Sequence, residues 1–244
     1  LEKKIKKKID AIIHLAAITN VKDSAKNPIN TYNKNVNGTL KLLNFARKKK
    51  VKKFVFASTE WVYGSFNNEK KSIKSKIDTT QLDNHYSLSK YLCENIINLD
   101  NDVMSVILRF GIIYGNRVSN LTALEELTKL ALNNKKIKIG SLNTSRNFLH
   151  VEDLVKGIFK AIYVKQNRNL VLDLQGKKSI RLGDILKVLK KKLNRKIDFL
   201  ETNKKNPSIK KVNYNSSHAK LNFKPEIDIE KGLDKVINTF KNEK

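Results

Sequence analysis

Two side chains four residues apart, Tyr86 and Lys90, form the pair in this chain whose types and spacing suggest chemistry. On a helix, residues four apart lie on one face, so the two side chains can act as one acid–base unit. A free phenol titrates at about pH 10, and Tyr86 can act as a base at neutral pH only if a nearby cation, such as Lys90, stabilises its anion. The pair therefore indicates an oxidoreductase-type active site.

The segment upstream, residues 51–64 (VKKFVFASTEWVYG), predicts a buried strand with polar side chains at its carboxyl end. Ser58 and Thr59 supply two hydroxyls there, and Glu60 supplies a carboxylate. Open α/β sheets bind their ligands at the carboxyl ends of the strands. We therefore expect these three residues to belong to the same site as the tyrosine and the lysine.

The composition excludes several classes of protein. With 244 residues, of which 40% are hydrophobic, the chain can bury a sizeable α/β core. A single cysteine, Cys93, cannot form an internal disulfide, which fits a reducing cytosol. No spacing of His, Asp and Glu suggests a metal site. No apolar run approaches the ~20 residues of a membrane span, so we expect a cytoplasmic protein without a membrane partner.

The formal net charge of +27 raises nucleic acid as a partner, because neutralising phosphates drives non-specific binding. Only seven of the 50 basic residues are arginine, however, whereas base readout favours arginine. The lysine clusters are scattered and lack interleaved aromatic residues on which bases could stack. The pattern favours solvated surfaces, and an RNA- or scaffold-binding protein is kept as an alternative.

The first half of the chain alternates strands and helices, which predicts a doubly wound parallel sheet. Residues 10–17 form a continuous apolar run, as expected of a strand buried on both faces. Asn27 and Pro28 begin a helix that extends to about residue 49. Strands at 54–58 and 103–110 flank a helix. This helix carries the tyrosine and the lysine and ends at about residue 99. The apolar face of the first helix is predicted to consist of Ile29, Tyr32, Val36, Leu40 and Leu43.

The pattern changes after Gly115 to a smaller, mixed α/β region. Helices are predicted at 121–133, 151–164, 182–193 and 229–240, and strands at 136–139, 170–174 and 197–200. We therefore expect one domain over residues 1–115 and a second, interleaved with the sheet, over residues 116–244.

Several motifs in order along almost the whole chain resemble an extended short-chain dehydrogenase/reductase of the NAD-dependent nucleotide-sugar epimerase/dehydratase type. The resemblance implies a Rossmann-type NAD-binding domain, a C-terminal substrate domain, a nucleotide-sugar substrate and a homodimer. NADP stays open as the cofactor. The motifs are DAIIHLAA at 10–17, NVNGT at 35–39, ST with VYG at 58–64, Tyr86-x-x-x-Lys90, LRF at 108–110 with YG at 114–115, and RNFLHVED at 146–153.

The resemblance assigns roles to individual residues. Tyr86 is the acid/base at a sugar hydroxyl while hydride passes to or from nicotinamide. Lys90 binds the nicotinamide ribose and lowers the pKa of the tyrosine, and Thr59 bonds the reacting oxygen. Substrate contacts are expected from Thr59, Glu60 and Arg146, whose fork can grip a diphosphate. Cofactor contacts are expected from Ala16, Ala17, Asn35, Ser58, Tyr86 and Lys90.

Two departures from the family pattern bear on activity. None of the nine glycines forms a G-x-G or G-x-x-G-x-x-G phosphate turn, so we expect about 60 N-terminal residues, one βαβ unit, to be missing. Such a chain alone would bind NAD poorly and be inactive, and a non-catalytic remnant is a second alternative.

In sugar dehydratases an acid–base pair follows the catalytic threonine, whereas this chain has Glu60-Trp61, which favours epimerase or reductase over dehydratase.

The histidines and one arginine have structural interpretations. His14, in an apolar strand, is expected to be a hydrogen-bonded core residue, and His150, ahead of a helix, a capping residue. Arg109 is interpreted as a buried structural cation, and Ser58 as packing on the cofactor side and not as a catalytic group. For Asn35, a cofactor contact and a bond to a neighbouring strand are equally favoured.

Overall fold

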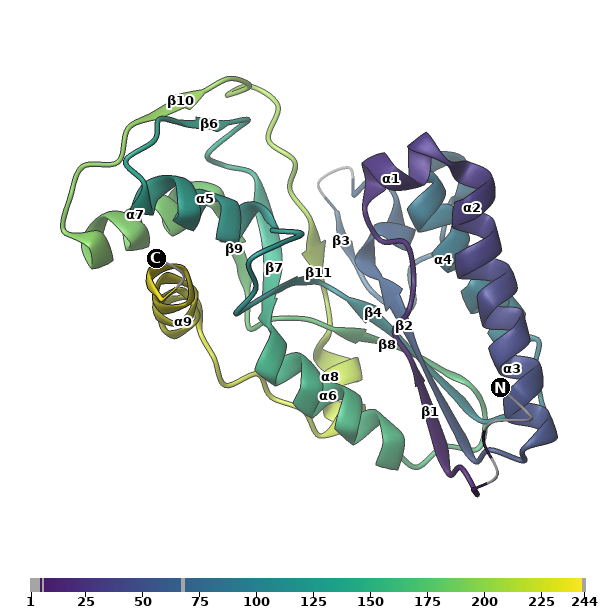
Figure 1. Ribbon diagram of the computed structural model, residues 1–244. Coiled ribbons are helices and arrows are strands. Elements are labelled where there is room, and N and C mark those ends of the chain that lie inside the picture. The colour runs from purple at the N-terminus through teal and green to yellow at the C-terminus, as the bar shows by residue number, and fades with distance from the viewer. Residues whose placement is uncertain (1–4, 6, 67–68, 243–244) are drawn as a thin grey trace.

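A four-stranded parallel sheet forms the centre of the structure, a computed structural model that describes residues 5, 7–66 and 69–242 (Figure 1). The strand order is β1-β2-β4-β8, so the chain crosses between strands through helices. The last of these strands comes from the second half of the sequence. The strands are β1 (Ala11–His14), β2 (Lys53–Thr59), β4 (Ser105–Phe110) and β8 (Leu170–Leu174).

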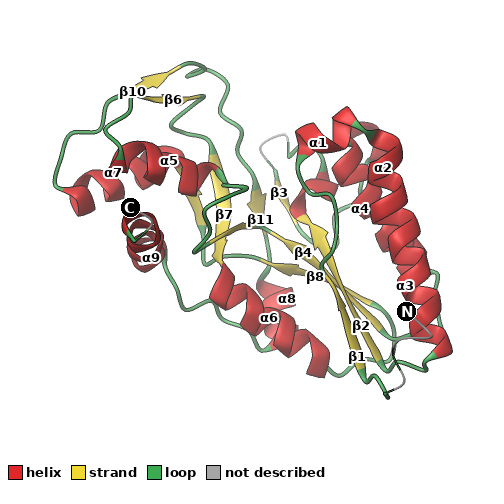
Figure 2. Ribbon diagram, in the orientation of Figure 1, coloured by secondary structure: helices red, strands yellow, loops and turns green. Residues whose placement is uncertain are grey.

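Helices cover both faces of this sheet (Figure 2). On one face lie α1 (Val21–Lys26), α2 (Pro28–Tyr32), α3 (Gly38–Lys48) and α4 (His85–Asn98). On the other lie α6 (Val151–Tyr163) and α8 (Asn215–Leu221). Separate clusters of buried apolar side chains join the sheet to each helical layer. The predicted doubly wound, Rossmann-type sheet is therefore confirmed.

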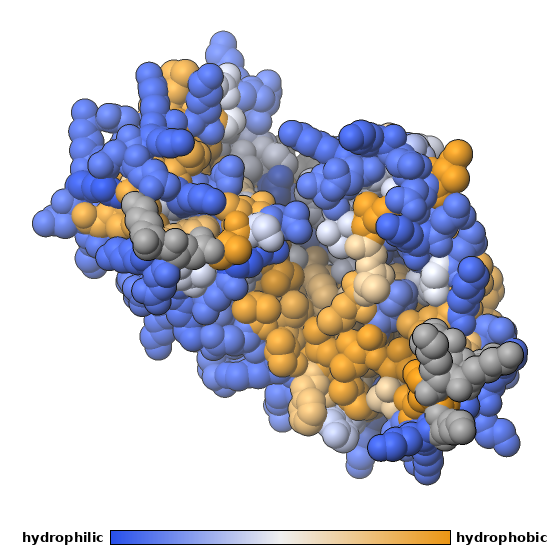
Figure 3. Space-filling model, in the orientation of Figure 1, coloured by the Kyte–Doolittle hydropathy of each residue, from blue (hydrophilic) through white to orange (hydrophobic). Residues whose placement is uncertain are grey.

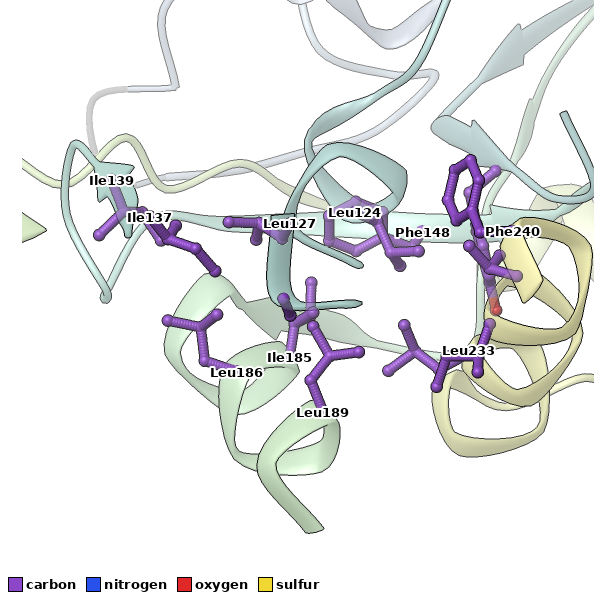
Figure 4. Close-up of a cluster of buried hydrophobic side chains, with 14 residues drawn as sticks. Leu124, Leu127, Ile137, Ile139, Phe148, Ile185, Leu186, Leu189, Leu233 and Phe240 are labelled. Atoms are coloured by element: carbon purple, nitrogen blue, oxygen red, sulfur yellow. The ribbon is translucent and has the colours of Figure 1, made fainter. Parts of the chain in front are cut away.

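A second hydrophobic core lies beside the sheet, among α5 (Ala123–Leu132), α7 (Leu182–Leu193) and α9 (Ile229–Lys241) (Figure 4). Three small sheets accompany it. β7 (Ser145–His150) pairs with β5 (Ile112–Tyr114) and β9 (Ser179–Arg181), and β6 (Ile137–Ile139) pairs with β10 (Phe199–Glu201). β3 (Lys70–Lys71) pairs with β11 (Lys211–Val212). Most residues of this core lie after residue 115, and the domain division expected there stays a prediction.

The helical segment predicted from Pro28 to about residue 49 is present but not uniform, because a π-helical turn (Asn33–Asn37) separates α2 from α3. The Asn27 side chain caps it, as predicted, by accepting from the N–H of Asn30 at 3.0 Å. The predicted apolar face is partly wrong, since Ile29 is 76% and Leu40 43% exposed. The buried row, spaced by four, is polar at Thr31, Asn35 and Thr39 and ends at Leu43, which is buried as predicted.

Strand β1 was expected to be buried on both faces, and this is wrong. It lies at the sheet edge, pairs with β2 alone among the described strands, and leaves Ile13 43% and Leu15 53% exposed. Exposed apolar side chains of α6 continue this surface, and Figure 3 shows hydrophobic residues gathered over the two elements. We call it the β1–α6 apolar face; its members are Ile13, Leu15, Val151, Val155, Phe159 and Tyr163.

Within the described part of the chain, every helix is too short or too polar to cross a membrane.

Candidate active site

Helix α4 positions the tyrosine and the lysine. Asn84 caps it by accepting from the N–H of Ser87 at 2.8 Å, which sets where the first turn begins. The Lys90 side chain is only 3% exposed. Its Nζ donates to the carbonyl oxygen of Ala57 in β2 at 2.7 Å and lies 4.7 Å from the centre of the Phe56 ring. Burial lowers the pKa of Lys90 to about 8.

The Tyr86 hydroxyl lies at the carboxyl end of β2, where it hydrogen-bonds the Thr59 side chain. Burial raises the pKa of Tyr86, and the neighbouring Glu60 carboxylate raises it further, while the bond to Thr59 lowers it. The sequence-based expectation was a pKa lowered by Lys90, so the direction found is the opposite. The reason is the burial of the phenol, which outweighs the hydrogen bond to Thr59.

Glu60 is completely buried next to the reactive hydroxyls. Burial raises its pKa to about 7, although Lys210 and then Arg146 act to lower it. With the Gln175 amide oriented to donate, its nitrogen lies 3.2 Å from Oε2 of Glu60. The other oxygen, Oε1, has no hydrogen-bond partner in the described structure. A buried, unpartnered oxygen is unfavourable unless a ligand supplies the missing donor.

A buried ionic network underlies the site and joins α4 to the sheet. Arg109 in β4 donates to both carboxylate oxygens of Glu94, with distances of 2.6–3.2 Å. Ser58 donates its hydroxyl to the same carboxylate. The Tyr63 hydroxyl donates to Asp173 of β8, where burial raises the pKa of the carboxyl to about 7. Arg109 is thus a buried cation, as interpreted from the sequence.

Asn35 fixes the loop that follows β1. Its Oδ1 accepts from the N–H of Ile18 at 2.8 Å, and its Nδ2 donates to the Ile18 carbonyl at 3.0 Å and to Ser89 of α4 at 2.9 Å. These bonds hold the preceding residues, Ala16 and Ala17, close to the helix that carries Tyr86. Ala17 lines a cavity of about 530 Å³. The cofactor contacts expected of Asn35, Ala16, Ala17 and Ser58 stay predictions.

Arg146 lies on a separate cavity of about 450 Å³, with Trp61 and Lys210 among the other lining residues. Its Nη1 donates to the carbonyls of Ser145 and Ser208, and its Nη2 donates to the Ser208 hydroxyl at 3.0 Å. The guanidinium is therefore held in place by the backbone of two segments. A fixed guanidinium on a cavity wall is suited to bind an anionic group.

The predicted histidine roles agree with the geometry. His14 bonds the Thr39 hydroxyl at 2.9 Å, and burial, with help from Lys90, lowers the pKa of His14 to about 4. The His150 side chain accepts from the N–H of Glu152 at the first turn of α6.

Sequence reasoning missed four residues near the site: Glu94, Asp173, Gln175 and Lys210. A signal existed for Glu94, which follows Tyr86 and Lys90 at the same spacing of four. No comparable signal marks Lys210, because it lies in a run of lysines.

The residues present fit one end of a dinucleotide better than the other. The hydroxyls and the lysine at the end of β2 suit the reacting nicotinamide end. The pyrophosphate end needs a Gly-rich turn, and the loop directly after β1, residues 15–20, contains no glycine. Two glycines elsewhere, Gly111 and Gly176, allow close packing against the backbone of β7.

Comparisons with known proteins agree with this geometry. A UDP-glucuronate 4-epimerase of Thermodesulfobacterium geofontis is 27% identical over 241 residues, which cover 96% of this chain and 73% of that protein. A UDP-glucose 4-epimerase of Mycoplasma genitalium is 35% identical over 170 residues, which cover 62% of this chain and 49% of that protein.

Among solved structures, UDP-glucuronic acid 4-epimerase from Bacillus cereus, in complex with UDP-glucuronic acid and NAD, matches with a TM-score of 0.84 and 25% identity. The match covers 97% of this chain and 76% of that one. The model of the family described as NAD dependent epimerase/dehydratase matches residues 1–171, which is more than half of the chain. With its doubly wound sheet and its paired tyrosine and lysine, the chain belongs to the NAD-dependent epimerase/dehydratase family.

Proposed function

We propose that this chain carries the catalytic centre of an NAD-dependent epimerase that inverts a hydroxyl-bearing carbon of a nucleotide sugar. The observation that carries the proposal is the contact between the Tyr86 hydroxyl and Thr59, one helical turn from Lys90, at the carboxyl end of β2. A phenol and an alcohol in contact can both reach the oxygen of one bound sugar hydroxyl.

The residues divide the proton chemistry between them. Tyr86 removes the proton of the reacting hydroxyl and later returns it, and Thr59 keeps that oxygen aligned. Bound NAD supplies the acceptor and donor of the hydride. A positive charge on an oxidised nicotinamide held at this site would oppose the burial that raises the pKa of the phenol. Lys90 holds the end of β2 through Ala57.

The substrate class follows from the relatives, which are named for UDP-sugars. Trp61 stands where a dehydratase of this family needs a proton-transferring side chain, and an indole cannot abstract a proton. Epimerisation is therefore favoured over dehydration. The homodimer, the division at residue 115 and the cytoplasmic location stay predictions.

The proposal is tested by replacing Tyr86 with Phe. Because the 244 residues contain no Gly-rich turn, the assay uses a protein in which a Gly-rich βαβ unit of a relative precedes residue 1. Tyr86→Phe keeps the ring and removes only the acid/base hydroxyl, so we expect turnover of UDP-glucose or UDP-glucuronate to fall by about 10²- to 10⁴-fold while NAD stays bound. The control is Tyr91→Phe, which removes a hydroxyl from another face of the same helix. Near-normal turnover in Tyr86→Phe would refute the assigned role.

A further inference from the structure

A surface cavity of about 290 Å³ lies between α7 and β10 in the smaller α/β region. Its floor is apolar and consists of Leu142, Leu186, Ile197 and Phe199. None of the described residues that line it also lines the cavity of Arg146 or that of Ala17. Figure 1 shows α7 and β10 at the end of the molecule away from β1. The cavity is therefore separate from the candidate active site.

The apolar floor is fixed by the fold and one of its walls is exposed. Leu186 is buried in the core beneath it, whereas the Phe199 side chain is 45% exposed. The N–H of Leu142 donates to the Glu201 carboxylate at 2.9 Å, and the Leu142 carbonyl accepts from the N–H of Gly183 at 2.9 Å. These bonds join the segment after β6 to β10 and to the first turn of α7. A pocket that is formed in advance costs less entropy to fill, and exposed apolar surface of this kind marks interaction sites.

The rim of this cavity is cationic. Arg181, Lys187 and Lys190 line it, and Asp184 is the one acidic residue among the described residues that do so. The Asp184 carboxylate lies 3.3 Å from the Lys187 ammonium and compensates that charge. Within the described part of the chain, no ion pair of Arg181 or of Lys190 is found. The rim therefore keeps an excess of positive charge around an apolar floor.

The positive charge continues along α7 beyond the cavity. A more open depression shares Lys187 and Lys190 with the cavity and adds Lys191, Asn194 and Arg195. Positions 187, 190, 191 and 194 are spaced by three and four, so they lie on one face of the helix. We call the apolar cavity together with this row of cations the α7–β10 groove. Its elongated shape suits an extended chain better than a compact anion.

We propose that the α7–β10 groove binds an acidic polypeptide segment, which inserts one apolar side chain into the cavity and places carboxylates against Lys190, Lys191 and Arg195. Charge complementarity supports this partner, because opposite charges at the rim of an interface select the partner while a buried apolar anchor supplies affinity. A nucleic acid suits the groove less well. Its bases stack on aromatic rings, and the floor offers one such ring, that of Phe199, beside aliphatic side chains.

The test is a fluorescence-anisotropy titration of the 244-residue chain with labelled probes, which requires no turnover. One peptide has a central phenylalanine with glutamates on both sides, and a second has alanine in place of the phenylalanine. A single-stranded oligouridylate is the third probe. We expect the phenylalanine peptide to bind about 10- to 100-fold more tightly than the alanine peptide, because a buried phenyl group is removed from water.

Two pairs of variants locate the binding. Phe199→Ser removes the exposed wall of the cavity and should weaken binding of the phenylalanine peptide by about 5- to 20-fold. Leu200→Ser, at the adjacent position and also 45% exposed, is the matched control and should change it by less than about twofold. Lys190→Glu should weaken binding by about 3- to 30-fold. Lys41→Glu on α3 changes the net charge equally and should have less than about a twofold effect. Circular dichroism shows whether each variant is folded.

Three results would overturn the inference. The first is that the phenylalanine peptide does not bind, or binds no more tightly than the alanine peptide. The second is that Lys190→Glu and Lys41→Glu weaken binding equally, which would show only the general attraction of a chain with a net charge of +27. The third is that oligouridylate binds more tightly than the peptide and is released by Lys190→Glu, which would make a nucleic acid the occupant of the groove.

Discussion

Lys90 holds its charge where burial disfavours it. The ammonium is 3% exposed and bonded to one carbonyl, that of Ala57, and burial lowers the pKa of Lys90 to about 8. Lysines whose pKa is shifted in this way are concentrated at functional sites, because burial and neighbouring groups adjust the pKa to the chemistry of the site. A lysine on the solvated face of α4 would show no such shift. Its burial supports a place in the site for Lys90 beyond the spacing to Tyr86.

Replacing Lys90 with Met tests the lowered pKa of Lys90 through the pH dependence of the free energy of unfolding. The unfolded lysine titrates near its ordinary pKa of 10.5, whereas the folded one has a pKa of about 8. Between these values the unfolded chain binds more protons, so the stability of the unaltered protein rises with pH. The Lys90→Met protein lacks this rise. We expect the unaltered protein to gain up to about 3 kcal/mol relative to the variant between pH 8 and 10.5, measured by denaturant unfolding. If the free energies of unfolding of the two proteins change with pH in the same way, Lys90 is solvated.

The residues that could be predicted from the sequence are those with regular spacing or a place at a strand end. Tyr86 and Lys90 met the first condition and Thr59 the second. Asp173 and Lys210 met neither, because their roles depend on which side chains the fold brings beside them. Asp173 reaches Tyr63 across 110 residues of chain. Such long-range contacts leave no local pattern.

At the level of elements, α4 is fastened to β4 by the ion pair of Arg109 and Glu94. Both side chains are almost fully buried. Taking two charges out of water is costly, and the pair is tolerable because three hydrogen bonds join the partners and Ser58 bonds the same carboxylate. The ring of Tyr63 lies 4.8 Å from the guanidinium carbon. The network therefore sets the height of α4 above the sheet and with it the position of Tyr86.

A double-mutant cycle measures the interaction energy between Arg109 and Glu94. Arg109→Met leaves the Glu94 carboxylate buried and unpaired, so we expect a loss of about 3–5 kcal/mol in the free energy of unfolding. Adding Glu94→Met removes the orphaned charge, so the double variant should be more stable than the sum of the two single losses predicts. Lys187→Met, which breaks an exposed ion pair with Asp184, serves as the control and should cost less than about 1 kcal/mol. Additive losses in the cycle would contradict the network.

The long elements were predictable and the short ones were not. The strands predicted at 54–58 and 103–110 matched β2 and β4 because each is a continuous apolar run that the fold buries. The helix predicted to end at about residue 99 matched α4. The small strands β5, β7 and β9 are stabilised by pairing with each other across distant segments, which periodicity does not record. Thr31 and Thr39 were missed as inward residues because hydrogen bonds bury them, such as the one between Thr39 and His14, and not apolar packing.

At the scale of the whole molecule, the described chain leaves an apolar surface and a strand edge uncovered. The β1–α6 apolar face is exposed, and one edge of β1 has no partner among the described strands. Exposed edges of this kind tend to pair with other chains. A further parallel strand beside β1, followed by a helix, would cover both features.

We predict that the 244-residue chain by itself binds NAD weakly. Phosphate binding in this fold depends on backbone N–H groups at a Gly-rich turn and at the positive end of a helix. Lysine side chains elsewhere cannot replace them. We expect calorimetry to show no NAD binding at micromolar concentration for this chain, and to show it when a Gly-rich βαβ unit precedes residue 1. A one-site isotherm at micromolar affinity from the chain alone would contradict this expectation.

The central claim, that the site of Tyr86 inverts a sugar carbon by removing and returning hydride, is tested most directly by an isotopic label. A nucleotide sugar carrying deuterium on the carbon that inverts is converted by the protein with its Gly-rich βαβ unit and NAD, and the product is examined by NMR. We predict that the deuterium stays on the same carbon of the product, because hydride held by the cofactor does not exchange with water. Loss of the deuterium to solvent would show that the carbon is deprotonated instead, and would contradict the account.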